Sequence, residues 1–157
     1  MKKLDKIDYH ILDILQKNSR ITNQDLASEV SLAPSSCLQR VRRLQSSNLI
    51  SGYHARLNLS EICEFVTCIV NVKLKSHSHE ELKAFTEVVK LIPEVVECYT
   101  VNGECDYILK VISRNMTAYL EINDKLVSSP LYVATTTTHV VFDENKSFTH
   151  VALDTLS

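Results

Sequence analysis

Apolar residues in the first fifty positions recur at the spacing of helices. The first such set, in steps of three or four, is Leu4, Ile7, Ile11 and Leu15. This spacing predicts a helix over residues 5–17 that ends near Asn18 and Ser19. A second helix is expected after Thr22, because Thr22 and Asp25 form a capping-box pattern. Its buried stripe is predicted to be Leu26, Ala27 and Val30.

A third helix is expected after a turn at residues 31–33, because Pro34 fits the first helical position, where its missing N–H breaks no hydrogen bond. The helix is predicted to end at about Ser47. Its apolar side is expected to hold Pro34, Cys37, Leu38, Val41 and Leu44. The opposite side carries hydroxyl, amide and guanidinium groups and no acid, from Ser35, Ser36, Gln39 and Arg43, flanked by Arg40 and Arg42. Such a surface suits DNA.

The second half of the chain changes to a period of two at Phe65, which is typical of a strand. Between the halves, residues 50–59 look extended. The elements predicted after that point are, in order, a strand from Phe65 to Leu74, a helix capped by Ser78 and Glu81 and stopped by Pro93, strands over 95–101 and 107–113 joined by a tight hairpin at Asn102 and Gly103, a helix after Asn115, and a strand over 132–142.

The order β-α-β-β-α-β is that of a ferredoxin-like domain, so the predicted class is α+β, a three-helix unit followed by a ferredoxin-like unit. The expected domains are residues 1–50 for DNA binding, 51–64 as a linker strand, and 65–157 as the ferredoxin-like unit. Two helices cover only one face of the four-stranded sheet. A symmetric partner subunit is the economical cover for the other face, and it would supply a second DNA-reading helix.

Charge is unevenly distributed along the chain. Residues 1–60 hold nine basic and five acidic residues, a balance of +4, whereas residues 61–157 hold eight and fourteen, a balance of −6. This asymmetry indicates a polyanion-binding module joined to one with another role. No apolar run is long enough for a membrane span and no signal peptide is evident, so the protein is expected to be cytoplasmic.

Cysteine and histidine positions favour neither a disulfide framework nor a metal site. The five cysteines are odd in number and never form a CxxC pair, and the six histidines are scattered. No catalytic residue, metal ligand or cofactor is predicted.

Several motifs together resemble the Lrp/AsnC family of bacterial and archaeal transcriptional regulators over nearly the whole chain. In the first half the matching residues are Leu4-Asp5-x-x-Asp8 with Ile11-Leu12, Arg20-Ile21-x-Asn23-x-x-Leu26-Ala27, Leu32-x-Pro34-Ser35-x-Cys37-Leu38-x-Arg40-Val41-x-Arg43-Leu44 and Ile50-x-Gly52-Tyr53-x-Ala55. In the second half they are Gly103-x-x-Asp106-Tyr107 and Thr136-x-Thr138.

The resemblance implies a regulator that binds double-stranded DNA through a winged-helix-like domain at residues 1–50. It also implies that residues 65–157 serve ligand sensing and oligomerisation. The candidate DNA-binding residues are Asn23, Ser35, Ser36, Gln39, Arg40, Arg42 and Arg43. Ser35, Ser36 and Arg40 suit phosphate contacts. Gln39 suits adenine edges, and Arg43 suits guanine or phosphate.

The resemblance also implies an effector domain that dimerises through its sheet, dimers that assemble into larger rings, often octamers, and an amino acid or related metabolite as effector. The implied effector-binding residues are Asn102, Gly103, Glu104, Asp106, Tyr107, Thr136 and Thr138. Gly103 would let the backbone approach the ligand, and Asp106 would attract an α-ammonium group or pin the loop. The chain departs from the family pattern at Ala33, at Cys105 and at Pro130-Leu131-Tyr132.

Two other functions remain open at this point. An effector-independent architectural protein that wraps DNA is favoured by the changed pocket residues Cys105, Leu131 and Tyr132. Siroheme decarboxylases resemble the same two-domain architecture, so the fold alone does not exclude an enzyme. The acidic second half and its unclustered histidines argue against that function, and no enzymatic activity is expected.

Overall fold

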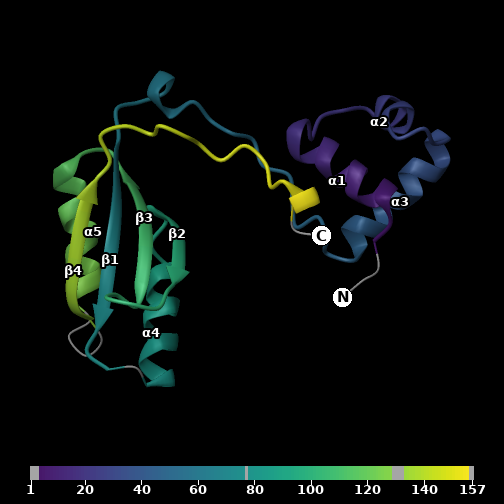
Figure 1. Ribbon diagram of the computed structural model, residues 1–157. Helices are drawn as coiled ribbons and strands as arrows, with labels where there is room; N and C mark the ends of the chain where they lie inside the picture. Colours follow the sequence, from purple (N-terminus) through teal and green to yellow (C-terminus); the bar gives the residue numbers. More distant parts are fainter. Residues whose placement is uncertain (1–3, 77, 129–132, 156–157) are drawn as a thin grey trace. The chain divides into compact units, whose positions relative to one another are not determined.

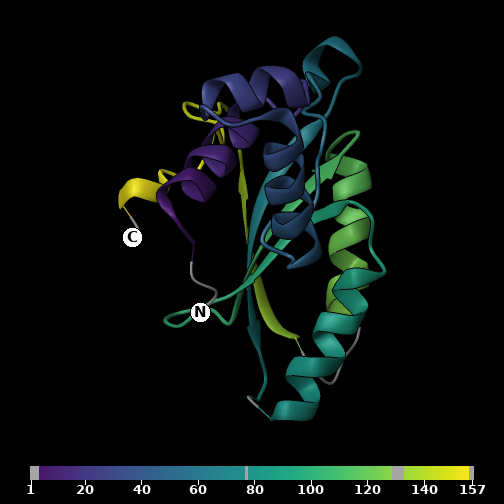
Figure 2. The same cartoon turned by 90° about the vertical axis from the view of Figure 1, so that its right-hand side faces the viewer.

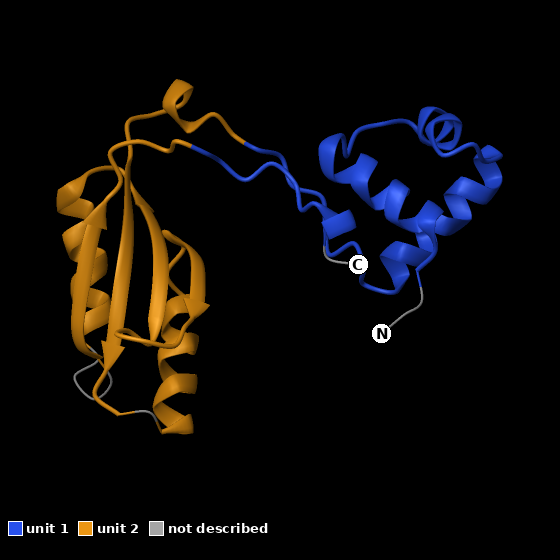
Figure 3. Cartoon of the chain, viewed as in Figure 1, with its two compact units in different colours: residues 1–56, 146–157 blue, residues 57–145 orange. Residues whose placement is uncertain are grey.

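The computed structural model describes residues 4–76, 78–128 and 133–155. The chain divides into two compact units, one formed by residues 1–56 with 146–157 and the other by residues 57–145 (Figure 3). Within the described residues, no helix is long and apolar enough to cross a membrane.

Three helices form the first unit: α1 (Lys6–Lys17), α2 (Asn23–Glu29) and α3 (Pro34–Ser46) (Figure 1). Their buried core consists of Ile11, Leu15, Leu26, Ala27, Val30, Cys37 and Leu44. These helices agree with the sequence prediction. Leu38 was expected on the apolar side of α3 but is 37% exposed. It lies one residue, or about 100°, from Cys37, whereas Leu44 returns close to the direction of Cys37.

Side chains cap two of these helices but not the third. Asp5 and Asp8 form a reciprocal capping box at the start of α1. The Thr22 hydroxyl accepts a hydrogen bond from the Asp25 backbone N–H at the start of α2, which confirms Thr22 as the N-cap. Ala33 occupies the N-cap of α3 without a side-chain hydrogen bond, so Pro34 is the only sequence feature here that favours starting the helix.

The end of the chain belongs to the first unit. The Gln16 amide group both donates to and accepts from the Val151 backbone, at 3.2 and 2.9 Å, and Arg56 donates to the Phe148 carbonyl at 3.2 Å. The domain expected over residues 65–157 is therefore too long at its C-terminal end.

The linker strand expected over 51–64 is wrong as well. That segment pairs with no strand of the sheet and contains only the short helix η1 (Leu59–Glu61).

The second unit is an antiparallel sheet with two helices, as predicted. Its elements are β1 (Val66–Leu74), α4 (His79–Lys90), β2 (Val95–Thr100), β3 (Tyr107–Ser113), α5 (Met116–Val127) and β4 (Val133–Val140). The sheet order is β2-β3-β1-β4, so the first and third strands lie in the middle. Both helices pack on the same face (Figures 1 and 2). The alternating residues of β1 and β3 that face them are buried, including Val70 and Leu109 at 0% exposure.

The connection between β2 and β3 is longer than the predicted two-residue hairpin. The Val101 N–H donates to the Asp106 carbonyl, so residues 102–105 lie between the last paired positions. Gly103 has a φ of 120°, a conformation that favours glycine. Cys98 lies opposite Leu109, whereas a tight turn at Asn102 would have set it opposite Tyr107. The predicted final strand starts at Tyr132, which lies outside the described residues.

The sheet face opposite the helices carries a mixed apolar and polar surface. The register sets Ile69 opposite Lys110 and His139, and Tyr99 opposite Ile108. Ile69 and Ile108 are half-buried and Tyr99 is 54% exposed. Among the described residues of the second unit, no helix covers this face, as the sequence predicted.

Candidate nucleic-acid interface and effector region

The outward side of α3 is polar and exposed. Ser35, Ser36, Gln39 and Arg42 are all exposed, and the helix contains no acidic residue. Ser35, Gln39 and Arg42 lie roughly opposite Cys37, which is fully buried, so they point away from the core. The side chains available on this surface are a hydroxyl, an amide and a guanidinium, which are the groups that bind phosphates and base edges.

Asn23 links the beginnings of α2 and α3. Its side-chain amide nitrogen donates to the Pro34 carbonyl at 2.9 Å. This bond holds the two helices of the helix-turn-helix together across the turn. The Asn23 amide, expected at the DNA, therefore has a structural contact in the free protein.

Arg40 is bound by two carboxylates of α1. Its Nη1 lies 2.7 Å from Asp5 Oδ2 and 3.0 Å from Asp8 Oδ1. The hydrogen bond from Arg40 is the main reason that the pKa of Asp5 lies below its ordinary value, and the same bond raises the pKa of Arg40. Arg40 therefore joins α3 to the start of α1.

Arg43 shares the second of these carboxylates. Its Nη2 lies 2.5 Å from Asp8 Oδ1, and the Asp8 side chain is 1% exposed whereas that of Arg43 is 54% exposed. A buried carboxylate is costly without compensating charge, and the two guanidinium groups provide it. The sequence analysis missed this cluster of Asp5, Asp8, Arg40 and Arg43. The capping pattern Asp5-x-x-Asp8 was visible, but helical spacing does not reveal that these acids reach α3.

Asp106, expected to bind an effector, fastens its own loop to the sheet. Its Oδ2 accepts from the Leu74 backbone N–H at 2.7 Å, and its backbone N–H donates to the Val72 carbonyl at 2.8 Å. This is the loop-pinning role, one of the two that the resemblance implied. Asn102, Gly103 and Glu104 are exposed in the same loop.

The side chains of three other residues that were expected to bind the effector point toward the helices instead. Tyr107 is 2% exposed, donates its hydroxyl to the Leu82 carbonyl at 3.1 Å, and packs against Phe85. Thr136 donates to the Asn123 side-chain oxygen at 3.2 Å, and the hydroxyls of Thr138 and Tyr119 are hydrogen-bonded. All three side chains lie in the layer between the sheet and the helices, because alternate strand residues face opposite sides.

The hydroxyls of β4 on the other face belong to the neighbouring positions. Thr135 and Thr137 pair with Lys73 and Asn71 of β1, and both threonines are exposed. The side chains of Thr136 and Thr138, predicted to bind an effector, lie on the helix-facing side of β4. Pro130-Leu131-Tyr132, one of the three expected departures from the family pattern, lies outside the described residues.

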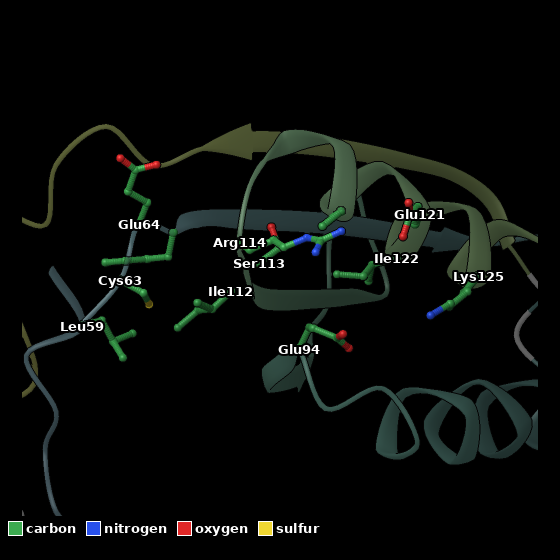
Figure 4. Close-up of a pocket in the computed structure, with 12 residues that line it drawn as sticks. Leu59, Cys63, Glu64, Glu94, Ile112, Ser113, Arg114, Glu121, Ile122 and Lys125 are labelled. Carbon is green, nitrogen blue, oxygen red and sulfur yellow. The ribbon is translucent and has the colours of Figure 1, made fainter.

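A hollow of about 530 Å³ lies at the opposite end of β3 from this loop (Figure 4). Its lining includes the apolar Ile112 and Ile122 and the charged Glu94, Arg114 and Lys125. None of the predicted effector residues lines it.

No metal or redox centre is evident in the part of the chain that the structure describes. No group of three histidine, cysteine or acidic residues is placed to hold a metal ion. All five cysteines are free, and burial raises the pKa of Cys37 and Cys68, which makes these two thiols less reactive.

Comparison with known proteins agrees with this arrangement over both units. The family model described as the Lrp/AsnC ligand binding domain matches residues 67–151, and that of a winged helix-turn-helix DNA-binding domain matches residues 4–51. The leucine-responsive regulatory proteins of Escherichia coli K12 and Klebsiella pneumoniae are each 35% identical to this chain over 154 residues, which cover 98% of this chain and 94% of theirs.

Two crystal structures extend the likeness to three dimensions. An AsnC family transcriptional regulator from Agrobacterium tumefaciens has a TM-score of 0.88 and 31% identity, covering 98% of this chain and 100% of that one. A transcriptional regulator from Neisseria meningitidis, in complex with L-Met, has a TM-score of 0.89 and 30% identity, covering 99% and 100%. The chain therefore belongs to the Lrp/AsnC family of transcriptional regulators, with a helix-turn-helix domain that binds DNA followed by a domain that binds a ligand.

Proposed function

We propose that this regulator acts as a homodimer or a larger oligomer in the cytoplasm, that α3 reads its DNA, and that an amino acid or a related metabolite adjusts its assembly. The observation that carries the DNA-binding part is the outward surface of α3, where Ser35, Gln39 and Arg42 are exposed on a helix that has no acid. Gln39 is suited to adenine edges and Arg42 to phosphate or guanine.

The ion pairs of α1 divide the proposed DNA contacts into two groups. Gln39 and Arg42 are exposed, and neither side chain is bonded to another described residue in a way that would compete with DNA. Arg40 and Arg43 are held by Asp8, so their first role is to fix α3 on α1. Substituting Arg42 therefore separates DNA binding from folding more cleanly than substituting Arg40.

The uncovered sheet face supports a dimer. Ile69, Ile108 and Ile112 lie on that face within the two central strands, and each is only half-buried in the protomer. A second copy that covered the face would remove them from water, which stabilises by about 25 cal/mol per Å² of apolar surface. A two-fold partner also supplies the second α3 that a two-fold operator requires.

The effector part is supported by the ligand-binding domain and by the L-Met that the Neisseria relative holds. The proposed ligand region is the loop of Asn102, Gly103 and Glu104, which Asp106 fastens to β1. These three residues are exposed in the protomer, and assembly between dimers is the event that would complete a site around them. A ligand that binds one assembly better shifts the population toward it.

An architectural, effector-independent role is the second candidate. It is favoured by the internal hydrogen bonds of Tyr107, Thr136 and Thr138, which occupy the groups expected to hold an effector. Under this proposal the protein wraps DNA around its oligomer and small molecules leave its affinity unchanged.

The deciding experiment measures binding of the full chain to the DNA upstream of its own gene, with and without a panel of amino acids. The R42A variant should bind much more weakly, whereas K90A should bind normally, because Lys90 pairs with Glu87 on α4 of the other unit. DNA binding that R42A leaves intact contradicts the role of α3. Binding that no amino acid alters, together with DNA protection over many helical turns, favours the architectural role.

A further inference from the structure

Arg40 is shared between two carboxylates that differ greatly in exposure. The side chain of Asp8 is 1% exposed and that of Asp5 is 52% exposed, while Arg40 itself is 28% exposed. Both carboxylates contact the same terminal nitrogen, Nη1. Arg40 therefore has one partner inside the protein and one at its surface.

The buried partner, Asp8, is expected to keep its ion pairs. Asp8 also pairs with Arg43, and its carboxylate is buried, so water could not compensate the charge if the arginines moved away. The exposed partner differs, because an ion pair in contact with solvent contributes little and is easily exchanged. An arginine has five N–H donors, and within the described residues those of Arg40 outside Nη1 have no recorded protein acceptor.

We propose that Asp5 is an intramolecular counterion for the recognition helix. In the free protein its carboxylate occupies the exposed side of the Arg40 guanidinium, and a phosphate of the DNA backbone displaces it on binding, while Asp8 keeps Arg40 in place. The proposal rests on the proposed role of α3 at DNA. It identifies Asp5 as a residue that sets affinity without itself contacting a base.

We expect the Asp5 carboxylate to weaken the sequence-independent binding of the protein to DNA, compared with a protein that lacks this charge. Each phosphate contact by an arginine releases counterions from DNA, and a carboxylate that remains beside the phosphate opposes that gain. Contacts to base edges by Gln39 are not affected in the same way, because they carry no net charge. Asp5 thus favours discrimination between specific and non-specific DNA over raw affinity.

The sequence of α1 offers a test that leaves the helix intact. Asp5 is the N-cap of α1, with Oδ1 accepting from the Asp8 N–H at 2.8 Å while Oδ2 binds Arg40. Asparagine caps helices as well as aspartate, so D5N removes the charge and keeps the cap. The matched control is D13N, which removes one charge from α1 at a site that pairs with Lys17 by an exposed contact of 2.7 Å.

Binding of the full chain to its upstream DNA and to an unrelated duplex of the same length is measured by fluorescence anisotropy over a series of salt concentrations. We expect D5N to bind the unrelated duplex about two- to fivefold more tightly than D13N does. The slope of log K against log salt should be steeper for D5N by up to about 0.9. The ratio of specific to unrelated binding should fall.

Two outcomes overturn the proposal while leaving the proposed function standing. The first is D5N that matches D13N in affinity and slope although the unmodified protein binds DNA. The second is D5N that binds both duplexes more weakly than the unmodified protein, which would make Asp5 a support for Arg40. Failure of the unmodified protein to bind either duplex would instead remove the proposed function and this inference with it.

Discussion

The buried carboxylate of Asp8 is the most informative place to perturb the DNA-binding unit. The change D8N keeps the size of the side chain and the oxygen that accepts from the Asp5 N–H at 3.1 Å. It removes the charge that binds Arg40 at 3.0 Å and Arg43 at 2.5 Å. The expected result is a less stable association of α1 with α3.

The size of the stability loss depends on which interactions Arg40 and Arg43 keep after the substitution. Removing one member of a wholly buried ion pair costs about 3–5 kcal/mol, because the other charge stays buried. Here Arg43 is 54% exposed and regains water, and Arg40 keeps Asp5. The loss is therefore smaller, and we expect D8N to lower the free energy of unfolding of this unit by about 2 kcal/mol.

Hydrogen exchange followed by mass spectrometry resolves the two units within the full chain. A loss of about 2 kcal/mol speeds exchange roughly 30-fold in those peptides of α1 and α3 that open with the whole unit. Peptides of β1 and β3 should keep their exchange rates, because the sheet has a separate core. D13N serves as the control and should change little, because Asp13 pairs with Lys17 at the surface. The reasoning is refuted if the exchange rates of α1 and α3 peptides are the same in D8N as in D13N.

Three further predictions concern the same unit. A33S supplies the missing N-cap of α3 and should raise the free energy of unfolding by about 0.5–2 kcal/mol in urea denaturation; no gain would mean that the cap is already satisfied by other groups. Removing residues 146–157 deletes both hydrogen bonds between Gln16 and Val151, so peptides of α1 should exchange faster while the sheet stays protected; equal protection would contradict a structural role for the tail. The pKa of Asp5 is lowered, mainly by its hydrogen bond from Arg40, so the stability that this bond adds is present above the ordinary pKa of 3.8 and is lost as the pH falls through the lowered value. D5N should therefore make Tm fall less steeply with acid in this pH range.

Local patterns were sufficient for most of the elements. Helical spacing located α1 to α3, and alternation located β1 and β3, because burial on one face imposes a period of 3.6 or 2 on the sequence. Capping residues located helix starts at Thr22, Ser78 and Asn115, whose side chains all accept backbone N–H groups as expected. These features depend on residues within a few positions of one another.

Predictions that depended on distant partners were less successful. Residues 51–64, expected as a linker strand, pair with no strand of the sheet. Residues 146–157, expected in the second domain, belong to the first unit. Thr136 and Thr138, which the resemblance placed at the effector, lie on the helix-facing side of β4, and the motif alone did not indicate that face. A motif fixes which residues share a face, and only the packed sheet fixes which face that is.

The sequence by itself determined the two-domain α+β organisation and the polar surface of α3, since periodicity and residue type define both. Only the tertiary structure decided how that surface is charged. The sequence of α3 has three arginines and no acid, and it predicts a uniformly cationic helix. Folding brings Asp5 and Asp8 against two of those arginines, because α1 must pack on α3 to bury the shared core. Arg42 is the arginine of α3 that no described acid pairs with, and that distinction arises from the packing of the helices rather than from their sequence.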